Sequence, residues 1–298
     1  MKVAIHSGRF HADEAFAIAA LKMLGPVDYI RTRDESVMKS CDLRVDVGRK
    51  YDPSTGDYDH HQPEFVGKRQ NGIPYAAFGL IWKEFGEKVC DSRDVSEFVD
   101  VQLVQILDAA DSGFDLFESK ISNVQPFTID SAIDDMMPSW KTENPSSQQI
   151  DEMFKPAVDL ASQVLNNAIE KARDRLDGDE FVRDAIKNAE DERLIVLDRY
   201  VPWQEIIIKE APNALFVVLP AWPSPNDDWI IKAIDIEIGS FKNRKKLPAS
   251  WSGMINDDLV AITGVSDAKF CHSSRFMAIA QSKEGCLELA KLAIKNEE

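Results

Sequence analysis

The N-terminal part of the chain alternates between short apolar runs and one longer amphipathic segment. Residues 2–6 form a short, partly β-branched apolar run, and residues 12–26 place Ala, Leu and Met on one recurring face. This pattern predicts a strand followed by a helix. Further strands are predicted at 27–32 and 42–48, and the Pro-Ser-Thr-Gly sequence within 51–61 predicts a turn. Strand, helix and more strands in this order indicate an α/β unit.

The middle of the chain has a helical pattern. Helical periodicity is present at 75–86 and at 94–107, and the sequence becomes loop-like near residue 143. Two long, charged helical patterns follow, at 148–176 and 178–192. We therefore expect a helical connector in this region.

Strand patterns return at 193–198, 214–220 and 229–238, and residues 275–296 are predicted to be helical. No internal repeat is visible. The predicted fold class is α/β, with a parallel sheet in the N-terminal domain, a helical connector and a second α/β domain at the C-terminus. The predicted boundaries of these three parts are 1–145, 146–193 and 194–298.

Composition excludes several classes of protein. A content of 44% hydrophobic and 29% charged residues is typical of a soluble globular protein, and no apolar run approaches the ~20 residues of a membrane span. Residues 1–10 lack the zones of a signal peptide, so a cytoplasmic location is expected. Cys41, Cys90, Cys271 and Cys286 are widely separated, which argues against a zinc ribbon or a disulfide framework.

The charge balance limits the kind of nucleic-acid binding. The chain has 35 basic and 51 acidic residues, and its formal net charge is −16. This charge argues against sequence-blind binding to long nucleic acid. A bound metal pair or a small basic patch can still create a local site for a polyanion inside an acidic protein.

Histidines are concentrated near the N-terminus. The chain has five histidines, and four of them lie in the first 61 residues: His6, His11, His60 and His61. Each lies close to an acid or at a strand-to-loop junction, and further acids end predicted strands or helices. These acids are Asp13, Asp46, Asp59, Asp108 and Asp111.

Imidazole and carboxylate ligands in this number predict a metal site. They suit Mn²⁺ or Mg²⁺, with Zn²⁺ and Fe²⁺ as further options, and two metals need a shared carboxylate and six or seven ligands. Loops that leave the carboxyl ends of strands converge on one crevice. Each residue alone has a simpler interpretation: Asp59 as a turn acid and Asp111 as part of a helix-end turn. The clustering favours the metal site.

Four short motifs resemble those of a known superfamily. The sequences HSGRFHADE, VDVG, DHHQ and LDAADSG are similar to the motifs of the DHH phosphoesterases, which include RecJ-type exonucleases and manganese-dependent inorganic pyrophosphatases. The sequences GRFHADEAFA and FCHSSRFMAIAQSKEGC resemble, more narrowly, the melanocyte-proliferating-gene family of Myg-type exonucleases. The likeness extends from residue 2 to about residue 294.

The resemblance implies a set of metal ligands. In the first motif His6 matches the histidine and Asp13 matches the second acid, while His11 stands where the first acid is expected. The spacing from His6 to His11 is one residue longer than in the pyrophosphatases. Asp46 matches the bridging carboxylate and His60 the histidine of the third motif. For the fourth motif, both Asp108 and Asp111 remain candidates, and Asp111 fits better by position. The implied cofactor is a pair of divalent ions, Mn²⁺ or Mg²⁺.

The resemblance also suggests residues that act on the substrate. His61 would face the substrate or support the ligands, and Asp59 would orient the neighbouring imidazole. The resemblance further implies that the C-terminal α/β domain is a substrate-binding domain. There His272 and Arg275 lie three apart at the start of the helix predicted from residue 275, where helix amides attract phosphate. Ser273 and Ser274 would offer hydroxyl groups. The alternative is a capped amphipathic helix without a ligand.

The run KNRKK is the one dense cationic stretch of the sequence. Its residues Arg244, Lys245 and Lys246 are candidates for contacts with a phosphate backbone, although such runs are usually solvated loops.

These features favour a metal-dependent phosphodiesterase with a two-metal mechanism, and the resemblance implies an exonuclease that hydrolyses RNA or short oligonucleotides. No Ser-His-Asp arrangement or Walker loop is apparent. One alternative is hydrolysis of a small phosphate compound: pyrophosphate, a cyclic dinucleotide or a nucleoside phosphate. Another is a non-enzymatic protein with a vestigial metal site. No membrane partner is expected, and a homo-oligomer is possible.

Overall fold

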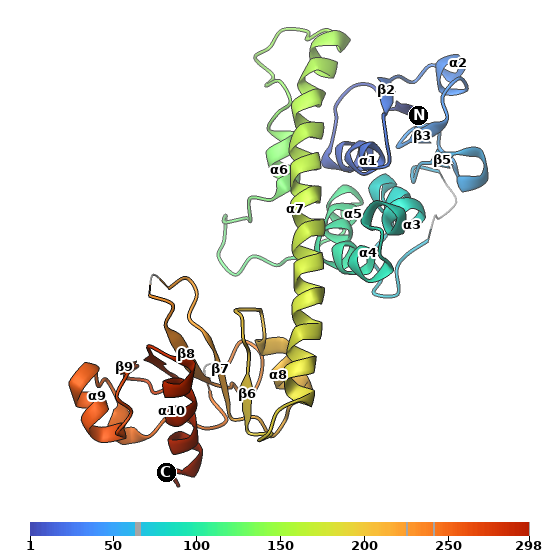
Figure 1. Cartoon of the computed structure of the whole chain (residues 1–298). Coiled ribbons are helices and arrows are strands. Elements are labelled where there is room, and N and C mark those ends of the chain that lie inside the picture. The colour runs from blue at the N-terminus through green and yellow to red at the C-terminus, as the bar shows by residue number, and fades with distance from the viewer. Residues whose placement is uncertain (63–66, 225, 241, 298) are drawn as a thin grey trace. The chain divides into compact units, whose positions relative to one another are not determined.

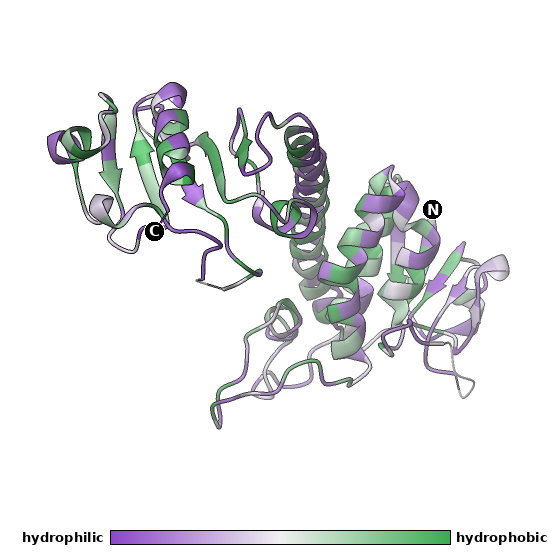
Figure 2. Cartoon of the chain, turned by 90° about the horizontal axis from the view of Figure 1, so that it is seen from below, coloured by the Kyte–Doolittle hydropathy of each residue, from purple (hydrophilic) through white to green (hydrophobic). Residues whose placement is uncertain are grey.

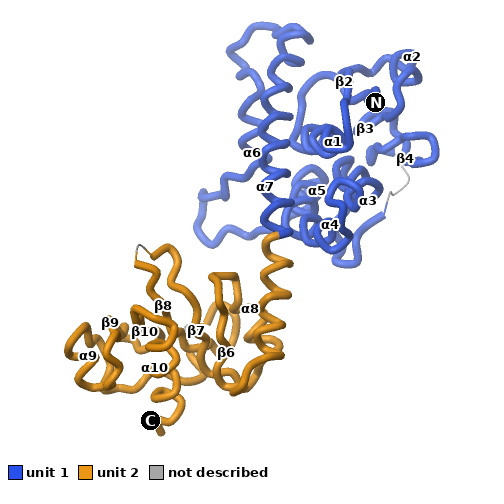
Figure 3. Tube along the Cα trace, in the orientation of Figure 1, with its two compact units in different colours: residues 1–173 blue, residues 174–298 orange. Residues whose placement is uncertain are grey.

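The structure is a computed structural model that describes residues 1–62, 67–224, 226–240 and 242–297. The chain divides into two compact units, Met1–Arg173 and Asp174–Glu298 (Figure 3). This division falls inside the segment 146–193 that we predicted as a connector. The three-part division of the chain stays a prediction.

The first unit is built on a five-stranded sheet in the order β2-β1-β3-β5-β4 (Figure 1). β1, β2, β3 and β5 run parallel, and β4 pairs with β5 in the antiparallel direction. The strands are β1 (Lys2–Ile5), β2 (Asp28–Arg31), β3 (Leu43–Val45), β4 (Tyr51–Asp52) and β5 (Asp57–Tyr58). The first three confirm the strands predicted from the apolar runs.

Helices cover this sheet and bury α1 almost completely. α1 is rich in alanine, and its small side chains allow close packing; Phe16 lies against Phe78 of α3 with ring centroids 5.5 Å apart. The chain between α4 and α5 forms a π-helical turn, Asp100–Val104. The helices are α1 (Ala12–Met23), α2 (Glu35–Met38), α3 (Ala77–Cys90), α4 (Arg93–Val99), α5 (Gln105–Asp111) and α6 (Ile129–Asp134).

α7 (Ser147–Lys187) is a single helix of 41 residues. The sequence predicted two helices, and this prediction was wrong, because Gly178 alone costs a helix only about 1 kcal/mol relative to alanine. Within the first unit α7 buries a stripe at helical spacing, which includes Phe154, Val158 and Leu165. Neither α7 nor any other helix of the described residues is long and apolar enough to cross a membrane.

The second unit contains a mixed five-stranded sheet in the order β6-β7-β8-β10-β9. β6 and β7 are parallel, and the other pairs are antiparallel. The chain is therefore an α/β protein with one largely parallel and one mixed sheet. The strands are β6 (Leu194–Val196), β7 (Phe216–Pro220), β8 (Trp229–Ala233), β9 (Ala268–Cys271) and β10 (Met277–Ala280), and the helices are α8 (Gln204–Glu210), α9 (Asn256–Thr263) and α10 (Lys283–Lys295).

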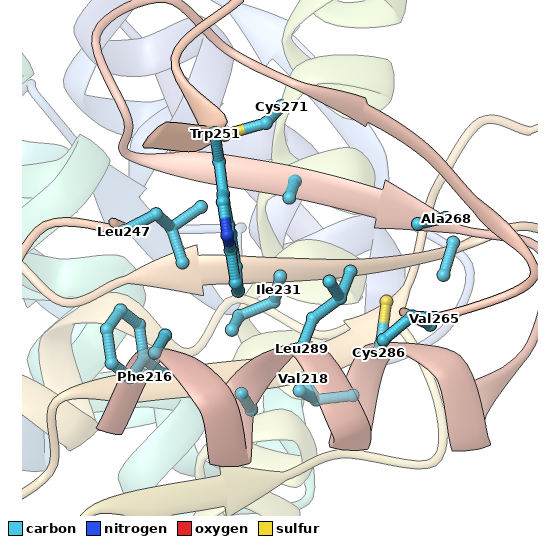
Figure 4. Packing of buried hydrophobic residues seen from close by; sticks show 14 of the residues in the cluster. Phe216, Val218, Ile231, Leu247, Trp251, Val265, Ala268, Cys271, Cys286 and Leu289 are labelled. Atoms are coloured by element: carbon cyan, nitrogen blue, oxygen red, sulfur yellow. The ribbon is translucent and has the colours of Figure 1, made fainter. Parts of the chain in front are cut away.

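Alternate residues of β7 supply two hydrophobic cores, one on each face of this sheet. Phe216 and Val218 pack with Leu289 of α10, and Trp251 stands among them (Figure 4). Val217 and Leu219 belong to the core on the other face, with residues of α8 and the end of α7. Figure 2 shows the strands of this sheet largely in green, for hydrophobic residues, and the helices in mixed colours. Both faces of β7 are buried, which accounts for its continuous apolar sequence.

The predicted helix at 275–296 is wrong over its first third. Residues 277–280 form β10, which pairs with β8 and β9, and the helix begins at Lys283 with Ser282 as its N-cap. The apolar run of β10 is too short to distinguish strand from helix by its sequence. Pairing with two strands decides it.

Candidate metal centre

Three predicted site segments leave neighbouring strands at one edge of the first sheet. His6 follows β1, Asp46 follows β3 and Asp59 follows β5. β1, β3 and β5 are parallel neighbours, so their carboxyl ends deliver these residues to the same edge. The Asp46 backbone has φ of 54°, a conformation that is uncommon outside glycine. Its N–H donates to the Tyr58 carbonyl, with 3.0 Å between the atoms.

His6, His11, Glu14 and Asp46 form a first group of possible metal ligands. One ligand atom from each lies within 4.8 Å of all the others. His6 Nε2 lies 2.9 Å from a Glu14 oxygen and 3.3 Å from an Asp46 oxygen. Glu14 is completely buried, and its carboxylate accepts the backbone N–H of His11 at the start of α1. A buried carboxylate beside two imidazoles suits a cation.

Asp46 also belongs to a second group, with His60 and His61. Its Oδ1 lies 3.4 Å from His60 Nε2 and 3.2 Å from His61 Nδ1. Asp46 Oδ1 and His60 Nε2 are both buried and have no hydrogen-bond partner among the described residues. Leaving buried polar atoms without partners is costly, and two such ligand atoms at one point fit a metal ion between the groups.

Asp13 and Asp111 complete a third group around His60. His60 Nε2 lies 3.1 Å from Asp111 Oδ2. Asp13 is buried, and its two oxygens accept the backbone N–H groups of Ala77 and Phe78, at 3.0 and 2.7 Å. Asp13 therefore satisfies the free amides at the start of α3 and joins that helix to the cluster. Its oxygens retain lone pairs for a cation.

The structure distinguishes the roles of Asp108 and Asp111. The Asp108 carboxylate accepts the Gly79 amide at 2.9 Å and the Arg69 guanidinium at 2.6 Å, and it is absent from the three groups of possible ligands in the described residues. Gly79 is required at this point, because a Cβ atom there would lie 1.8 Å from Asp108 Oδ2. Asp108 thus binds α5 to α3, whereas Asp111 faces the cluster.

The ionisation of the cluster follows from its charge pairs. Burial opposes protonation of His6, but hydrogen bonds to Asp46 and Glu14 outweigh it and raise the pKa of His6 to about 10. Burial likewise opposes protonation of His60, but the nearby carboxylates of Asp111 and Asp46 raise its pKa to about 11. Burial tends to raise the pKa of Asp46, but the three histidines around its carboxylate hold that pKa well below its usual range.

Asp13 and Asp108 respond differently because both lack a comparable set of cationic partners. Burial and repulsion from Asp111 raise the pKa of Asp13 well above its usual value. Burial raises the pKa of Asp108 to about 7 against the opposing effect of Arg69. In the absence of metal, imidazolium groups neutralise the remaining carboxylates.

Asp59 holds His61 in position. One Asp59 oxygen lies 2.9 Å from His61 Nδ1 and accepts the His61 backbone N–H, and the other oxygen accepts the Arg49 N–H at 2.6 Å. The His61 side chain is 57% exposed, which leaves its Nε2 accessible from solvent. Hydrogen bonds with Asp46 and Asp59 raise the pKa of His61 to about 9.

A cavity of about 450 Å³ opens onto these groups. Its wall contains His6, His11, Asp46, His61 and Asp111. Four further charged residues of the wall were not among the predicted site residues: Arg33, Arg49, Asp130 and Asp134. We call this cavity the metal pocket. Of the residues that the prediction missed, Glu14 carried a signal, since an acid three positions after the residue preceding a helix completes a capping box. The other missed residues, Arg33 and Arg49 in loops and Asp130 and Asp134 in α6, carried no such signal in the sequence.

The predicted substrate residues of the C-terminal part lie in a turn between β9 and β10. His272 Nδ1 accepts the Ser274 backbone N–H at 3.0 Å, and the Arg275 N–H donates to the His272 carbonyl at 2.8 Å. Ser273 and Ser274 are exposed. Since residue 275 precedes a strand, the expected helix N-terminus is not present at this position, and only the side chains remain as possible phosphate contacts.

The basic run is largely occupied by structural contacts. Arg244 donates to the carbonyl oxygens of Ile208, Ala211 and Ala214 at the end of α8 and beyond it. Lys245 donates to the Ile294 carbonyl at 3.0 Å near the end of α10. Cations stabilise helix C-termini in this way. Lys246 is exposed and lines a cavity with Lys232 and Ser274.

Comparison with known proteins identifies relatives along the whole chain. The MYG1 exonuclease model, described as uncharacterised protein family UPF0160, matches residues 2–294. A MYG1 protein of Schizosaccharomyces pombe is 31% identical over 99% of this chain and 97% of its own length. A MYG1 protein of Chlamydia trachomatis is 30% identical over 99% and 97%. The MYG1 exonuclease of Homo sapiens is 27% identical over 98% of this chain and 85% of its own.

Among solved structures, a pGpG-specific phosphodiesterase, PggH of Vibrio cholerae, aligns over 98% of both chains. Its sequence is 13% identical and the TM-score is 0.31, a similarity that supports no conclusion about this chain.

Proposed function

Since the chain belongs to the MYG1 exonuclease family, and is therefore a hydrolase of phosphoester bonds, we propose that it cuts RNA or short oligonucleotides from one end by a two-metal mechanism. The observation that carries this proposal is the position of Asp46. Its carboxylate is shared by two groups of possible ligands, so Asp46 would be able to hold both of two metal ions.

The donor set supports two adjacent ions. We assign His6, His11 and Asp46 to one ion, and Asp13, Asp46, His60 and Asp111 to the other, with Glu14 beside His6. The fit is supported by two buried ligand atoms without partners among the described residues, Asp46 Oδ1 and His60 Nε2. Carboxylates with imidazoles suit Mn²⁺, and Mg²⁺ is the second choice. When bound, such ions polarise a phosphoryl oxygen and lower the pKa of water.

The protein groups around the ions would position the substrate and move protons. His61 Nε2 is accessible, and Asp59 fixes the imidazole through Nδ1, so His61 is placed to donate a proton to the leaving oxygen. His272 and Arg275, with the hydroxyl groups of Ser273 and Ser274, remain our candidates for contacts to phosphate oxygens in the second unit. Lys246 is also a candidate for such a contact. Arg244 and Lys245 are not, because they already donate to backbone carbonyl oxygens near the ends of helices.

The test combines metal content with activity. Purified protein is assayed with Mn²⁺ or Mg²⁺ on 5′- and 3′-labelled RNA oligonucleotides and on pyrophosphate. We expect stepwise shortening of the RNA from one end. Turnover of pyrophosphate without any turnover of RNA would reject RNA as the proposed substrate. No turnover of either compound would reject the proposed enzymatic activity.

The matched variants are Asp46→Asn and Asp94→Asn. Asp46 is buried in the cluster, whereas Asp94 is exposed in the first turn of α4. We expect Asp46→Asn to lose bound metal in elemental analysis and to lose at least about 100-fold in kcat, because the carboxylate charge that both ligand groups share is gone. Asp94→Asn should retain both the bound metal and the wild-type kcat. Equal metal content in the two variants would contradict the assignment.

A further inference from the structure

A second cavity adjoins the metal pocket. It has a volume of about 610 Å³ and shares with the metal pocket the residues Arg33, Val47, Gly48 and Arg49. Arg33 follows β2 and Arg49 follows β3, so the shared wall is built by loops at the same sheet edge as the metal ligands. A substrate that occupies the metal pocket can extend into this second cavity past the two arginines.

The two shared arginines differ from the other arginines of the first unit. This unit contains eight arginines, and six of them lie within 4 Å of a carboxylate oxygen: Arg9, Arg31, Arg44, Arg69, Arg93 and Arg173. Arg33 and Arg49 have no carboxylate at that distance among the described residues. In a chain where acids outnumber bases 51 to 35, unpaired arginines are unexpected, and both line the metal pocket.

The contacts of Arg33 and Arg49 leave the terminal guanidinium nitrogens of both residues available. Arg49 is held by its backbone, whose N–H donates to Asp59 at 2.6 Å, and the residue has φ of 54°. Arg33 donates its Nε to the Ser7 carbonyl at 3.3 Å, which leaves the terminal nitrogens available. Guanidinium groups bind phosphate oxygens through paired hydrogen bonds, and both groups remain free to do so.

The other charges of the second cavity are paired. Arg44 contacts Asp57 at 2.5 Å, and Lys39 contacts Glu35 at 3.3 Å. These pairs contribute no net charge, so Arg33 and Arg49 give the cavity a net positive charge in an acidic protein. A cavity of this sign beside a metal pocket favours an anionic ligand.

We propose that Arg33 and Arg49 bind a second, non-reacting phosphate of the substrate in this cavity. The proposal rests on the proposed function and specifies its substrate class: a chain with at least two phosphodiester groups, one at the metals and the next at the arginines. Binding of the second phosphate holds the reacting one in register, so the arginines are positioning residues.

The test compares two substrates that differ by one nucleotide, and therefore by one phosphodiester group. Adenylyl-adenosine has one phosphodiester, and the corresponding adenosine trinucleotide has two. Both are hydrolysed by the wild-type protein and by the double variant Arg33→Gln/Arg49→Gln in Mn²⁺, and KM and kcat are measured separately. We expect the double variant to raise the KM for the trinucleotide about tenfold more than the KM for the dinucleotide, because charged hydrogen bonds are lost only with the longer substrate.

Arg93→Gln is the control, because Arg93 is exposed, pairs with Glu97 within α4 and is absent from both cavities. It should leave the ratio of the two KM values unchanged. An equal rise for both substrates would mean that the arginines contact the reacting phosphate, and no rise would mean that they contact none; either result overturns the inference. A wild-type protein inactive on both substrates rejects the proposed function itself, and the inference falls with it.

Discussion

His6 and His60, two of the proposed metal ligands, have carboxylates as neighbours. Burial opposes their protonation, but these carboxylates outweigh it and raise the pKa of His6 to about 10 and of His60 to about 11. Both lie above the ordinary histidine pKa of ~6.5. This stabilises the metal-free fold fully at pH values below ~6.5, and the contribution is lost as the pH rises through about 10 and 11.

We therefore predict that Mn²⁺ binding releases protons. At pH 7.5 both imidazoles are protonated, and binding should release about two protons, so that the apparent affinity weakens by about 100-fold for each unit of decrease in pH. Titration calorimetry in buffers with different ionisation enthalpies measures the number of protons released. A heat that does not depend on the buffer would contradict the assignment of His6 and His60 as ligands.

At the scale of elements, two buried carboxylates determine where α3 begins. Asp13 accepts the amides of Ala77 and Phe78, and Asp108 accepts that of Gly79. The residue that precedes α3, Ala76, cannot cap it with a side chain. α3 thus depends on acids from α1 and α5, and this explains why Asp108 is buried without being part of the ligand groups.

This arrangement predicts opposite effects of the same substitution in two helices. Gly79→Ala places a Cβ 1.8 Å from Asp108 Oδ2 and should destabilise the protein by about 2 kcal/mol or more. Gly178→Ala, inside α7, meets its nearest atom at 3.6 Å and should stabilise it by about 0.5–1 kcal/mol. Urea unfolding of both variants measures the difference. A loss of stability in Gly178→Ala as large as that in Gly79→Ala would argue against this account.

At the scale of the whole molecule, the candidate metal site and the two hydrophobic cores around the second sheet belong to different units. All proposed ligands lie in the first unit, whereas the two cores of the second unit surround its own sheet. A ligand that binds one folded unit stabilises that unit alone, unless the two unfold together.

We predict two calorimetric transitions, of which only one responds to metal. At a Mn²⁺ concentration about 100 times its Kd, the first unit gains about 2.7 kcal/mol, which corresponds to roughly 5–10 °C in its midpoint. Removal of Mn²⁺ with a chelator should reverse the shift. Asp46→Asn should abolish it, and an equal shift of both transitions would show that the units unfold as one.

The sequence by itself determined the elements whose pattern is strong. The apolar runs of β1, β2 and β3 and the alanine-rich periodicity of α1 follow from local burial, which leaves its period in the sequence. The association of His6, Asp46 and His60 was also predictable, because each residue stands at a strand end and parallel strands end at one edge.

Only the tertiary structure decided the remaining points. Asp108 and Asp111 have similar surroundings in the sequence, and Arg69, distant along the chain, distinguishes them. Residues 277–280 became a strand because β8 and β9 supplied hydrogen bonds that a short apolar run cannot specify. Arg33 and Arg49 resembled ordinary surface cations until their unpaired state beside the metal pocket was visible. In each case the decisive partner is far away in the sequence, and local patterns carry no record of it.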